Sequence, residues 1–413
     1  MNSLPKNACV YPFKGAMLMH GVPATPCCRF HDRFLSEADK ESINTFDATF
    51  ADIRETMMRN EWHQGCYKCQ ADEESKGSSM RTEADEFFEN FTDETKIEYL
   101  EITVGRLCNL ACHTCGPEFS HTWDKDALEM GYIDKSKLAK LKQDKQEYDL
   151  DNLDLNNLTN LKHIKVTGGE PFLHRQFLRF VVRLAEEGLA PQIKLEIFSN
   201  CTWYPEKANM DAIKQFKQVT IMLSMDGYNK INTLLRYPSK WDKIESTLDK
   251  WIATRDEITG GGTSLAYMMR ENPKNTEAIP PEEAFIVGAA CTVNVVNAPH
   301  IYEFMHWARI NKQIEVVLQT VYEPNHLSIL HWPDWYKRTL AFTIEQQFMS
   351  FNNRAKKMMP AYRLLKSMCE LTNNEDKSDE YISKIKKQFK LRDQKIKDAN
   401  LFVEMLRFND RQI

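Results

Sequence analysis

The sequence predicts an α/β protein built on a parallel sheet, because short strand-like runs alternate with helical patterns along most of the chain. Several of these runs are almost continuously apolar, as expected for strands that are covered on both faces. The 413 residues are ample for a large buried core and for more than one domain. Two architectures fit this pattern, a doubly wound sheet and an incomplete α/β barrel, and both bind ligands at the carboxyl ends of their strands.

Six runs rich in β-branched and aromatic residues are predicted as strands, and helical patterns separate most of them. The strands are expected over residues 98–104, 163–168, 193–200, 219–227, 285–295 and 315–322. The helices are expected over residues 176–187, 207–216, 243–255 and 300–311. Parallel strands joined in this way take right-handed crossovers.

The chain divides into four parts by composition. Residues 1–82 are irregular and rich in cysteine, with a helix expected over 36–60, and residues 83–97 form an acidic linker. Residues 98–333 hold the six strands, with a loop over 256–283 that is expected to act as a lid. Residues 334–413 form a helical extension, whose lysine-rich part is expected to be a solvated helix or, alternatively, a docking face.

Composition limits the possible functions. The 54 basic and 59 acidic residues leave a formal charge of −5, so no basic excess indicates nucleic-acid binding. No apolar stretch approaches the ~18 residues that a membrane span needs, and the N-terminus lacks the features of a secretory signal. We therefore expect a cytoplasmic protein with no membrane partner, and in a reducing compartment clustered cysteines are metal ligands or catalytic groups.

The motif that carries the chemistry follows the first predicted strand. Cys108, Cys112 and Cys115 are spaced by four and three residues, so their thiols can converge on one small site. Zinc prefers four ligands, and His113 is the nearest candidate for the fourth. An iron–sulfur cluster held by only three cysteines instead leaves one iron open to bind another molecule.

In this motif the chain resembles the radical S-adenosylmethionine (SAM) enzymes, whose cysteine loop follows the first strand of a partial (β/α)6 barrel. The next strand ends in Gly168-Gly169-Glu170-Pro171, which resembles the turn that binds the SAM amino group in that family. Glycine permits close approach of the backbone, and a carboxylate accepts a charge-assisted hydrogen bond from an amine. The resemblance also implies polar SAM contacts at the later strand ends, from Ser199, Asn200, Ser224 and Asp226, with Arg236 facing the SAM carboxylate. One position departs from the family, because Thr114 stands where a large apolar residue usually packs near the adenine.

A second cysteine set precedes the barrel. Cys9, Cys27, Cys66 and Cys69 resemble the ligands of the twitch and SPASM auxiliary-cluster modules, in which a short β-hairpin follows the first cysteine. Cys28 is an alternative to Cys27 that spacing does not exclude. Four thiolates also suit a structural zinc, so the resemblance implies an auxiliary iron–sulfur cluster with zinc as the alternative. The remaining cysteines are expected to be buried structural residues, namely Cys201, Cys291 and Cys369.

The resemblance implies an oxidoreductase in which a [4Fe–4S] cluster cleaves SAM reductively to a 5′-deoxyadenosyl radical that abstracts hydrogen from a substrate. It further implies a peptide or protein substrate and a one-electron donor such as flavodoxin or ferredoxin. A nucleotide, an RNA or a small metabolite is the alternative substrate, and a non-catalytic metal-binding scaffold is the alternative function. The acidic balance of the chain disfavours RNA.

Overall fold

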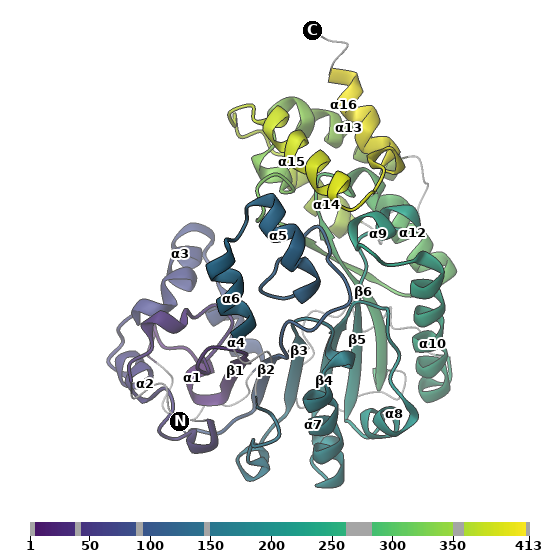
Figure 1. The fold of residues 1–413 in the computed structure, drawn as a ribbon. Coiled ribbons are helices and arrows are strands. Elements are labelled where there is room, and N and C mark those ends of the chain that lie inside the picture. Colours follow the sequence, from purple (N-terminus) through teal and green to yellow (C-terminus); the bar gives the residue numbers. More distant parts are fainter. Residues whose placement is uncertain are drawn as a thin grey trace.

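The protein is built around one parallel sheet of seven strands, seen at the centre of Figure 1. The computed structural model describes residues 5–37, 43–87, 94–143, 149–261, 283–349 and 359–409. The strands lie side by side in chain order, from β1 to β7. Their bounds are β1 Gly15–Met19, β2 Tyr99–Thr103, β3 His163–Thr167, β4 Lys194–Ser199, β5 Gln218–Ser224, β6 Phe285–Val293 and β7 Val316–Thr320.

All six predicted strands are confirmed as β2 to β7, and the strand order decides between the two predicted architectures. A doubly wound sheet reverses its strand order at a switch point, whereas here the order runs from β1 to β7 without reversal. β7 pairs only with β6 within the sheet, so the barrel stays open. The protein therefore has the predicted incomplete α/β barrel, extended by one strand from the N-terminal region.

Helices cover the outer face of the sheet. They are α7 Arg175–Glu186, α8 Lys207–Ile213, α10 Trp241–Thr259 and α12 Ile301–Asn311, and the four predicted helices are confirmed with shifted ends. In α7 the buried side chains recur at helical spacing, with Phe177, Phe180, Val181 and Leu184 facing the sheet. The predicted loop over 256–283 is corrected at its start, because α10 continues through Thr259. Residues 262–282, and with them the predicted lid, lie outside the described residues.

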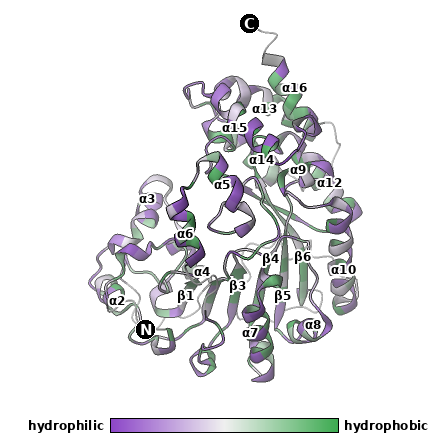
Figure 2. Ribbon diagram, viewed as in Figure 1, coloured by the Kyte–Doolittle hydropathy of each residue, from purple (hydrophilic) through white to green (hydrophobic). Residues whose placement is uncertain are grey.

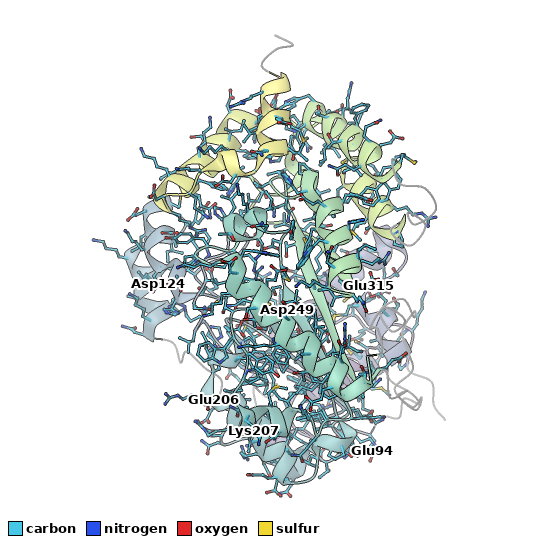
Figure 3. All side chains as sticks on the ribbon, turned by 90° about the vertical axis from the view of Figure 1, so that its right-hand side faces the viewer. Glu94, Asp124, Glu206, Lys207, Asp249 and Glu315 are labelled. Atoms are coloured by element: carbon cyan, nitrogen blue, oxygen red, sulfur yellow. The ribbon has the colours of Figure 1, made fainter. Side chains whose placement is uncertain are left out.

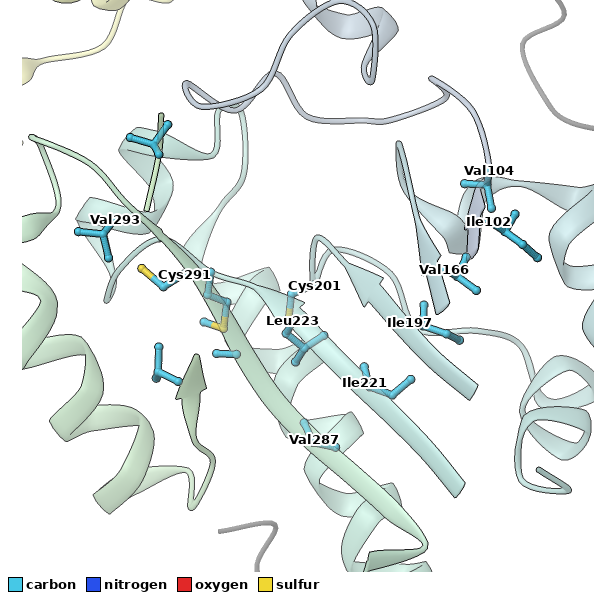
Figure 4. Close-up of a cluster of buried hydrophobic side chains, with 14 of the residues drawn as sticks. Ile102, Val104, Val166, Ile197, Cys201, Ile221, Leu223, Val287, Cys291 and Val293 are labelled. Carbon is cyan, nitrogen blue, oxygen red and sulfur yellow. The ribbon is translucent and has the colours of Figure 1, made fainter. Parts of the chain in front are cut away.

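The two faces of the sheet differ in character because successive side chains of a strand point to opposite sides. Ile102, Val166, Ile197 and Ile221 are fully buried on the outer face, beneath the helices (Figure 4). The strands and the inner sides of the helices form the hydrophobic bands seen in Figure 2. The alternate residues point into the barrel and are largely polar, as Lys165 shows. The inner face is therefore suited to bind a polar ligand.

The N-terminal region adds β1 to the edge of the sheet, where Gly15–Met19 pairs in parallel with Tyr99–Thr103. The hairpin that the resemblance implies after Cys9 is reduced to a single antiparallel bridge between Met17 and Thr25. The helix predicted over 36–60 is wrong for the described residues before Ala51, since among the described residues of this range only α2 is an α-helix, and Phe50 adopts a left-handed backbone just before it. The helices of this region are α1 Tyr11–Lys14, α2 Ala51–Met58, α3 Tyr67–Lys76 and α4 Met80–Phe87.

The C-terminal helices lie at the top of Figure 1, at the same end of the molecule as α5 and α9. The lysine-rich helix α15 is solvated on one face only, because Tyr381, Ile385 and Phe389 are buried. Ion pairs lie on the outer surface. In one of them, Nζ of Lys312 lies 2.7 Å from Oδ1 of Asp249 (Figure 3). None of the described helices combines the length and the apolar character that a membrane span requires. The remaining bounds are α5 Asp124–Met130, α6 Lys135–Gln143, α9 Lys230–Leu235, α13 Asp334–Met349, α14 Met359–Met368, α15 Ser378–Leu391 and α16 Asn400–Asn409.

Candidate functional site

A cavity of about 320 Å³ opens at the carboxyl ends of the strands, a volume within the range of small-molecule sites. It brings together nine residues that the sequence predicted or singled out, from five separate segments of the chain. These are Cys108, Cys112, Thr114, Cys115, Gly168, Gly169, Asn200, Ser224 and Arg236. Segments that lie more than a hundred residues apart therefore meet at one site because the strands are parallel.

The loop that carries the three cysteines is held by hydrogen bonds to its backbone. The indole N–H of Trp123 donates to the carbonyl of Cys112 at 2.9 Å. Burial raises the pKa of the Cys112 thiol to about 12 and that of the Cys115 thiol to about 11, and it also raises the pKa of Cys108. Binding of a metal centre to these buried thiols would release their protons.

His113 does not act as the predicted fourth zinc ligand. Its ring packs on Phe389, with the ring centroids 4.5 Å apart, and its Nε2 lies 2.9 Å from Oε1 of Gln394. Burial lowers the pKa of His113 to about 3, so the ring is neutral. In the described part of the chain, no three His, Cys, Asp or Glu side chains have the spacing of a site for a single metal ion. The geometry therefore gives no support to zinc at this loop.

The glycine pair after β3 is required by the close packing of its turn against the cysteine loop. A Cβ on Gly169 would lie 2.3 Å from the carbonyl oxygen of Leu107. Gly168 has a φ of +116°, which side chains rarely adopt, and a Cβ there would lie 2.9 Å from the nitrogen of Val104. Both positions line the cavity with backbone alone, which leaves their backbone open to a ligand.

Glu170 differs from its prediction as a direct ligand of the SAM amine. Its side chain is fully buried and is not among the cavity-lining residues. The carboxylate accepts hydrogen bonds from the backbone N–H of Asn200 at 2.7 Å and from the hydroxyl of Ser199 at 2.9 Å. Burial raises the pKa of Glu170 to about 7, although these donors favour the charged form. Glu170 and Ser199 thus tie the end of β3 to the end of β4, which a strand pattern does not reveal.

Asn200 faces the cavity beside the first cysteine. Its Nδ2 donates to Sγ of Cys108 at 3.6 Å and to Oδ1 of Asn109 at 2.9 Å. Amide hydrogen bonds to ligand sulfurs are one of the means by which proteins tune iron–sulfur clusters. Asn200 is therefore placed to contact a cluster ligand as well as SAM.

Asp226 and Arg236 form a buried ion pair, with Oδ2 of Asp226 2.8 Å from Nη1 of Arg236. Asp226 is fully buried and does not line the cavity, so the structure does not support its predicted direct contact with SAM, and its side chain contacts Arg236 instead. Its second oxygen accepts the backbone N–H of Thr292 at 3.0 Å. The Nε of Arg236 is buried and has no hydrogen-bond partner among the described residues. The arginine thus keeps an unused donor for an anionic ligand.

The sequence did not predict six of the residues that line the cavity. Lys165 on β3 points into the cavity, and its Nζ lies 3.7 Å from Oε1 of Glu101 on β2. Two aromatic rings, Phe119 and Phe198, supply the apolar surface that Thr114 does not. The alternation along β3 and β4 is a signal that identifies which side chains point inward. The residues not predicted are Leu110, Phe119, Lys165, Thr167, Phe198 and Gln319.

The N-terminal cysteines lie close enough to influence one another. Burial raises the pKa of the Cys9, Cys27 and Cys66 thiols, and neighbouring cysteines raise it further: Cys66 and Cys69 act on Cys9, Cys9 and Cys28 act on Cys27, and Cys27 and Cys69 act on Cys66. Burial also raises the pKa of Cys28, which responds further to Glu101 and Lys165 of the sheet. Cys66 thus responds to Cys27 and not to Cys28, which favours Cys27 as the member of the predicted ligand set. Arg81 holds the same region, since its Nη1 donates to the carbonyl of Ala8 at 2.9 Å.

The three scattered cysteines are buried, as predicted. Cys201 and Cys291 have no exposed surface and Cys369 is 6% exposed. All eleven cysteines of the chain are free thiols.

The part of the chain that supplies most of the cavity residues matches a known protein family. Residues 102–279 match the model of the Radical SAM superfamily. GTP 3′,8-cyclase of Aliarcobacter butzleri (strain RM4018) is 27% identical over 154 residues, which cover 37% of this chain and 42% of that protein. The chain thus matches less than half of the length of this curated relative.

Solved structures of other proteins superpose on part of this chain. Native anSMEcpe with bound AdoMet and Cp18Cys peptide is 13% identical and has a TM-score of 0.37, over 64% of this chain and 61% of that chain. SuiB of Streptococcus suis is 13% identical and has a TM-score of 0.33, over 84% of this chain and 70% of that chain. Residues 102–279 therefore form a domain of the radical SAM superfamily.

Proposed function

We propose that the chain is an oxidoreductase that cleaves SAM reductively at the cavity and uses the resulting radical on a substrate inside the barrel. The observation that carries the proposal is the convergence of three cysteine thiols, a glycine turn and a buried arginine on one cavity. The residues fit the cofactors. Cys108, Cys112 and Cys115 would hold a [4Fe–4S] cluster, and the unused Nε of Arg236 would donate to the SAM carboxylate.

When bound, the cluster supplies the electron that breaks a carbon–sulfur bond of SAM, so the chain itself binds, orients and shields. Arg236 is held in place by Asp226, which fixes the direction of its remaining N–H donors. Gly168 and Gly169 offer backbone groups to the methionyl amine, and Phe198 supplies apolar surface within the cavity.

The charges inside the barrel bear on the substrate, for which we propose a peptide or protein. A nucleoside triphosphate is the second candidate, because the curated relative is a GTP cyclase. Lys165 and Arg236 are the cationic residues that line the cavity, and each is already paired with a carboxylate. A triphosphate needs several cations that are not committed elsewhere. Lys165 instead offers N–H donors to the C=O groups of a peptide, which carry no charge that further cations must neutralise.

We further propose an auxiliary iron–sulfur cluster at Cys9, Cys27, Cys66 and Cys69. The support is the electrostatic influence that these thiols exert on one another, in which Cys66 responds to Cys27 and not to Cys28. Two [4Fe–4S] clusters would bring roughly eight irons to each chain. Replacing Cys66 by alanine should lower this to about four while leaving the SAM site loaded. An unchanged iron content in Cys66→Ala would contradict the auxiliary site.

The test of the main proposal is production of 5′-deoxyadenosine after anaerobic reconstitution with iron and sulfide. We expect the wild type to form it from SAM and dithionite, and Cys112→Ala to form none. Cys201→Ala is the matched control, because this buried cysteine lies outside both sets. Activity of Cys112→Ala equal to that of the control would refute the proposal. GTP should neither bind to the protein nor raise the rate of 5′-deoxyadenosine formation. A rise in this rate on addition of GTP would favour the nucleotide alternative.

A further inference from the structure

The C-terminal extension contacts the cysteine loop from the side opposite to the cavity. Phe389, near the end of α15, packs on the ring of His113, which stands between Cys112 and the cavity residue Thr114. Gln394, in the turn after α15, places its Oε1 2.9 Å from Nε2 of His113. Two residues of the extension therefore fix the side chain that adjoins the second cysteine.

Gln394 also reaches the segment that carries Arg236. Its Nε2 donates to the carbonyl of Leu234 at 2.6 Å. The same segment is hydrogen bonded to the cysteine loop, from the N–H of His113 to the carbonyl of Leu235 at 2.8 Å. One glutamine thus bridges the loop with the cysteines and the segment with the arginine proposed to bind SAM.

Arg392 lies behind the loop as a deeply buried cation, with its side chain 1% exposed. Its Nε donates to Oδ2 of Asp126 in α5 at 2.6 Å. The guanidinium lies 4.5 Å from the ring centroid of Trp123, whose indole N–H donates to the carbonyl of Cys112. Arg392 is therefore one residue removed from the backbone of a proposed cluster ligand.

The guanidinium is incompletely paired within the described part of the chain. Its Nη1 and Nη2 are buried and have no hydrogen-bond partner there. Burying unpaired N–H donors of a charged group is costly. One carboxylate and two aromatic faces, those of Trp123 and Tyr237, offset only part of that cost. A negatively charged group at Cys112 would attract the cation. A cluster held by three thiolates supplies such negative charge.

We propose that Arg392 and Gln394 are positioning residues of the cluster site, where Gln394 locks the cysteine loop and Arg392 supplies a fixed positive charge that raises the cluster's reduction potential. A nearby cation stabilises the reduced cluster, because reduction adds negative charge. This inference rests on the cluster site proposed above. It gives the C-terminal extension a role in the chemistry of the barrel.

The decisive measurement is the midpoint potential of the cluster whose EPR signal changes when SAM is added, which separates it from an auxiliary cluster. We expect Arg392→Met to shift this potential to a more negative value, and Arg392→Lys to restore it. Asp126→Asn removes the nearby negative charge and should shift the potential in the opposite direction. Lys390→Met is the matched control, since Lys390 is an exposed cation on the same helix and should leave the potential unchanged.

Gln394→Leu tests the lock, with the rate of iron loss to a chelator as the readout. We expect roughly tenfold faster loss, the effect typical of residues that orient metal ligands. Equal potentials in Arg392→Met, Asp126→Asn and the wild type, all fully loaded, would overturn the role of the charge. An unchanged rate of iron loss in Gln394→Leu would overturn the lock. A wild type without a SAM-sensitive cluster would overturn the proposed function itself, and this inference with it.

Discussion

Replacing Asp226 by asparagine is expected to destabilise the apoprotein strongly, because it breaks a buried ion pair from one side. Oδ2 of Asp226 lies 2.8 Å from Nη1 of Arg236, and the two side chains are 1% and 11% exposed. The carboxylate now accepts hydrogen bonds from the guanidinium and from the N–H of Thr292. An asparagine side chain has only one accepting oxygen, so its NH2 group would face one of these two donors. Removing one partner of a buried pair costs about 3–5 kcal/mol.

The assay is urea unfolding of the apoprotein under anaerobic conditions, followed by tryptophan fluorescence and far-UV circular dichroism. Glu61→Gln is the matched control, because its ion pair with Arg59 is more than half exposed on both sides. Exposed pairs contribute only ~0.2–1 kcal/mol. We therefore expect Asp226→Asn to lower the free energy of unfolding several times more than the control does. Equal losses in the two variants would refute the reasoning, since burial would then not govern the strength of the pair.

Three further outcomes are expected. Because burial raises the pKa of Glu170 to about 7, the native state binds the proton of this carboxyl more tightly than the unfolded state does. The contribution of Glu170 to stability therefore falls as pH rises from about 4.5 to about 7 and is flat above. The difference in free energy of unfolding in urea between the wild type and Glu170→Gln should change by about 3 kcal/mol over this range, and a difference independent of pH would contradict the reasoning. Gly169→Ala should impair SAM binding measured by calorimetry on the reconstituted protein, since its Cβ would meet the Leu107 oxygen at 2.3 Å. Gly188→Ala is also strained, at a φ of +71°, but it has nothing within 4 Å and does not line the cavity, so it should bind SAM normally. Phe180→Ala leaves a cavity beneath α7, where Phe180 is fully buried, and should cost ~3–5 kcal/mol in urea unfolding, with a loss below 1 kcal/mol excluding the predicted packing.

The barrel was predictable because its signals are local. The runs that became β2 to β7 alternate with helices, and their strongly apolar character follows from burial on both faces. Cys108, Cys112 and Cys115 were predictable for the same reason, since their spacing within eight residues determines that they share a loop. β1 was missed because five residues without strong periodicity pair only through contact with β2, which lies about eighty residues away in the chain.

The roles of Glu170 and Asp226 show where local signals end. Both carboxylates stand at strand ends beside the cavity, and the motif around each predicted contact with SAM. The partners of a carboxylate depend on which donors the neighbouring strands bring within reach. Here these donors are Ser199 and Asn200 for Glu170, and Arg236 for Asp226. Both side chains therefore position neighbouring residues of the site from within the protein interior.

By itself, the sequence determined the α/β class, the three cysteines that share one loop and the position of the glycine turn. Each of these follows from spacing or periodicity within a short segment. Only the tertiary structure placed Cys27, and not Cys28, where it acts on Cys66. It also brought Gln394 against His113 and Arg392 against Trp123, although each pair is more than 260 residues apart in the chain. The physical reason is that burial and charge pairing arise between segments distant in sequence, whose proximity is set by the packing of the whole chain.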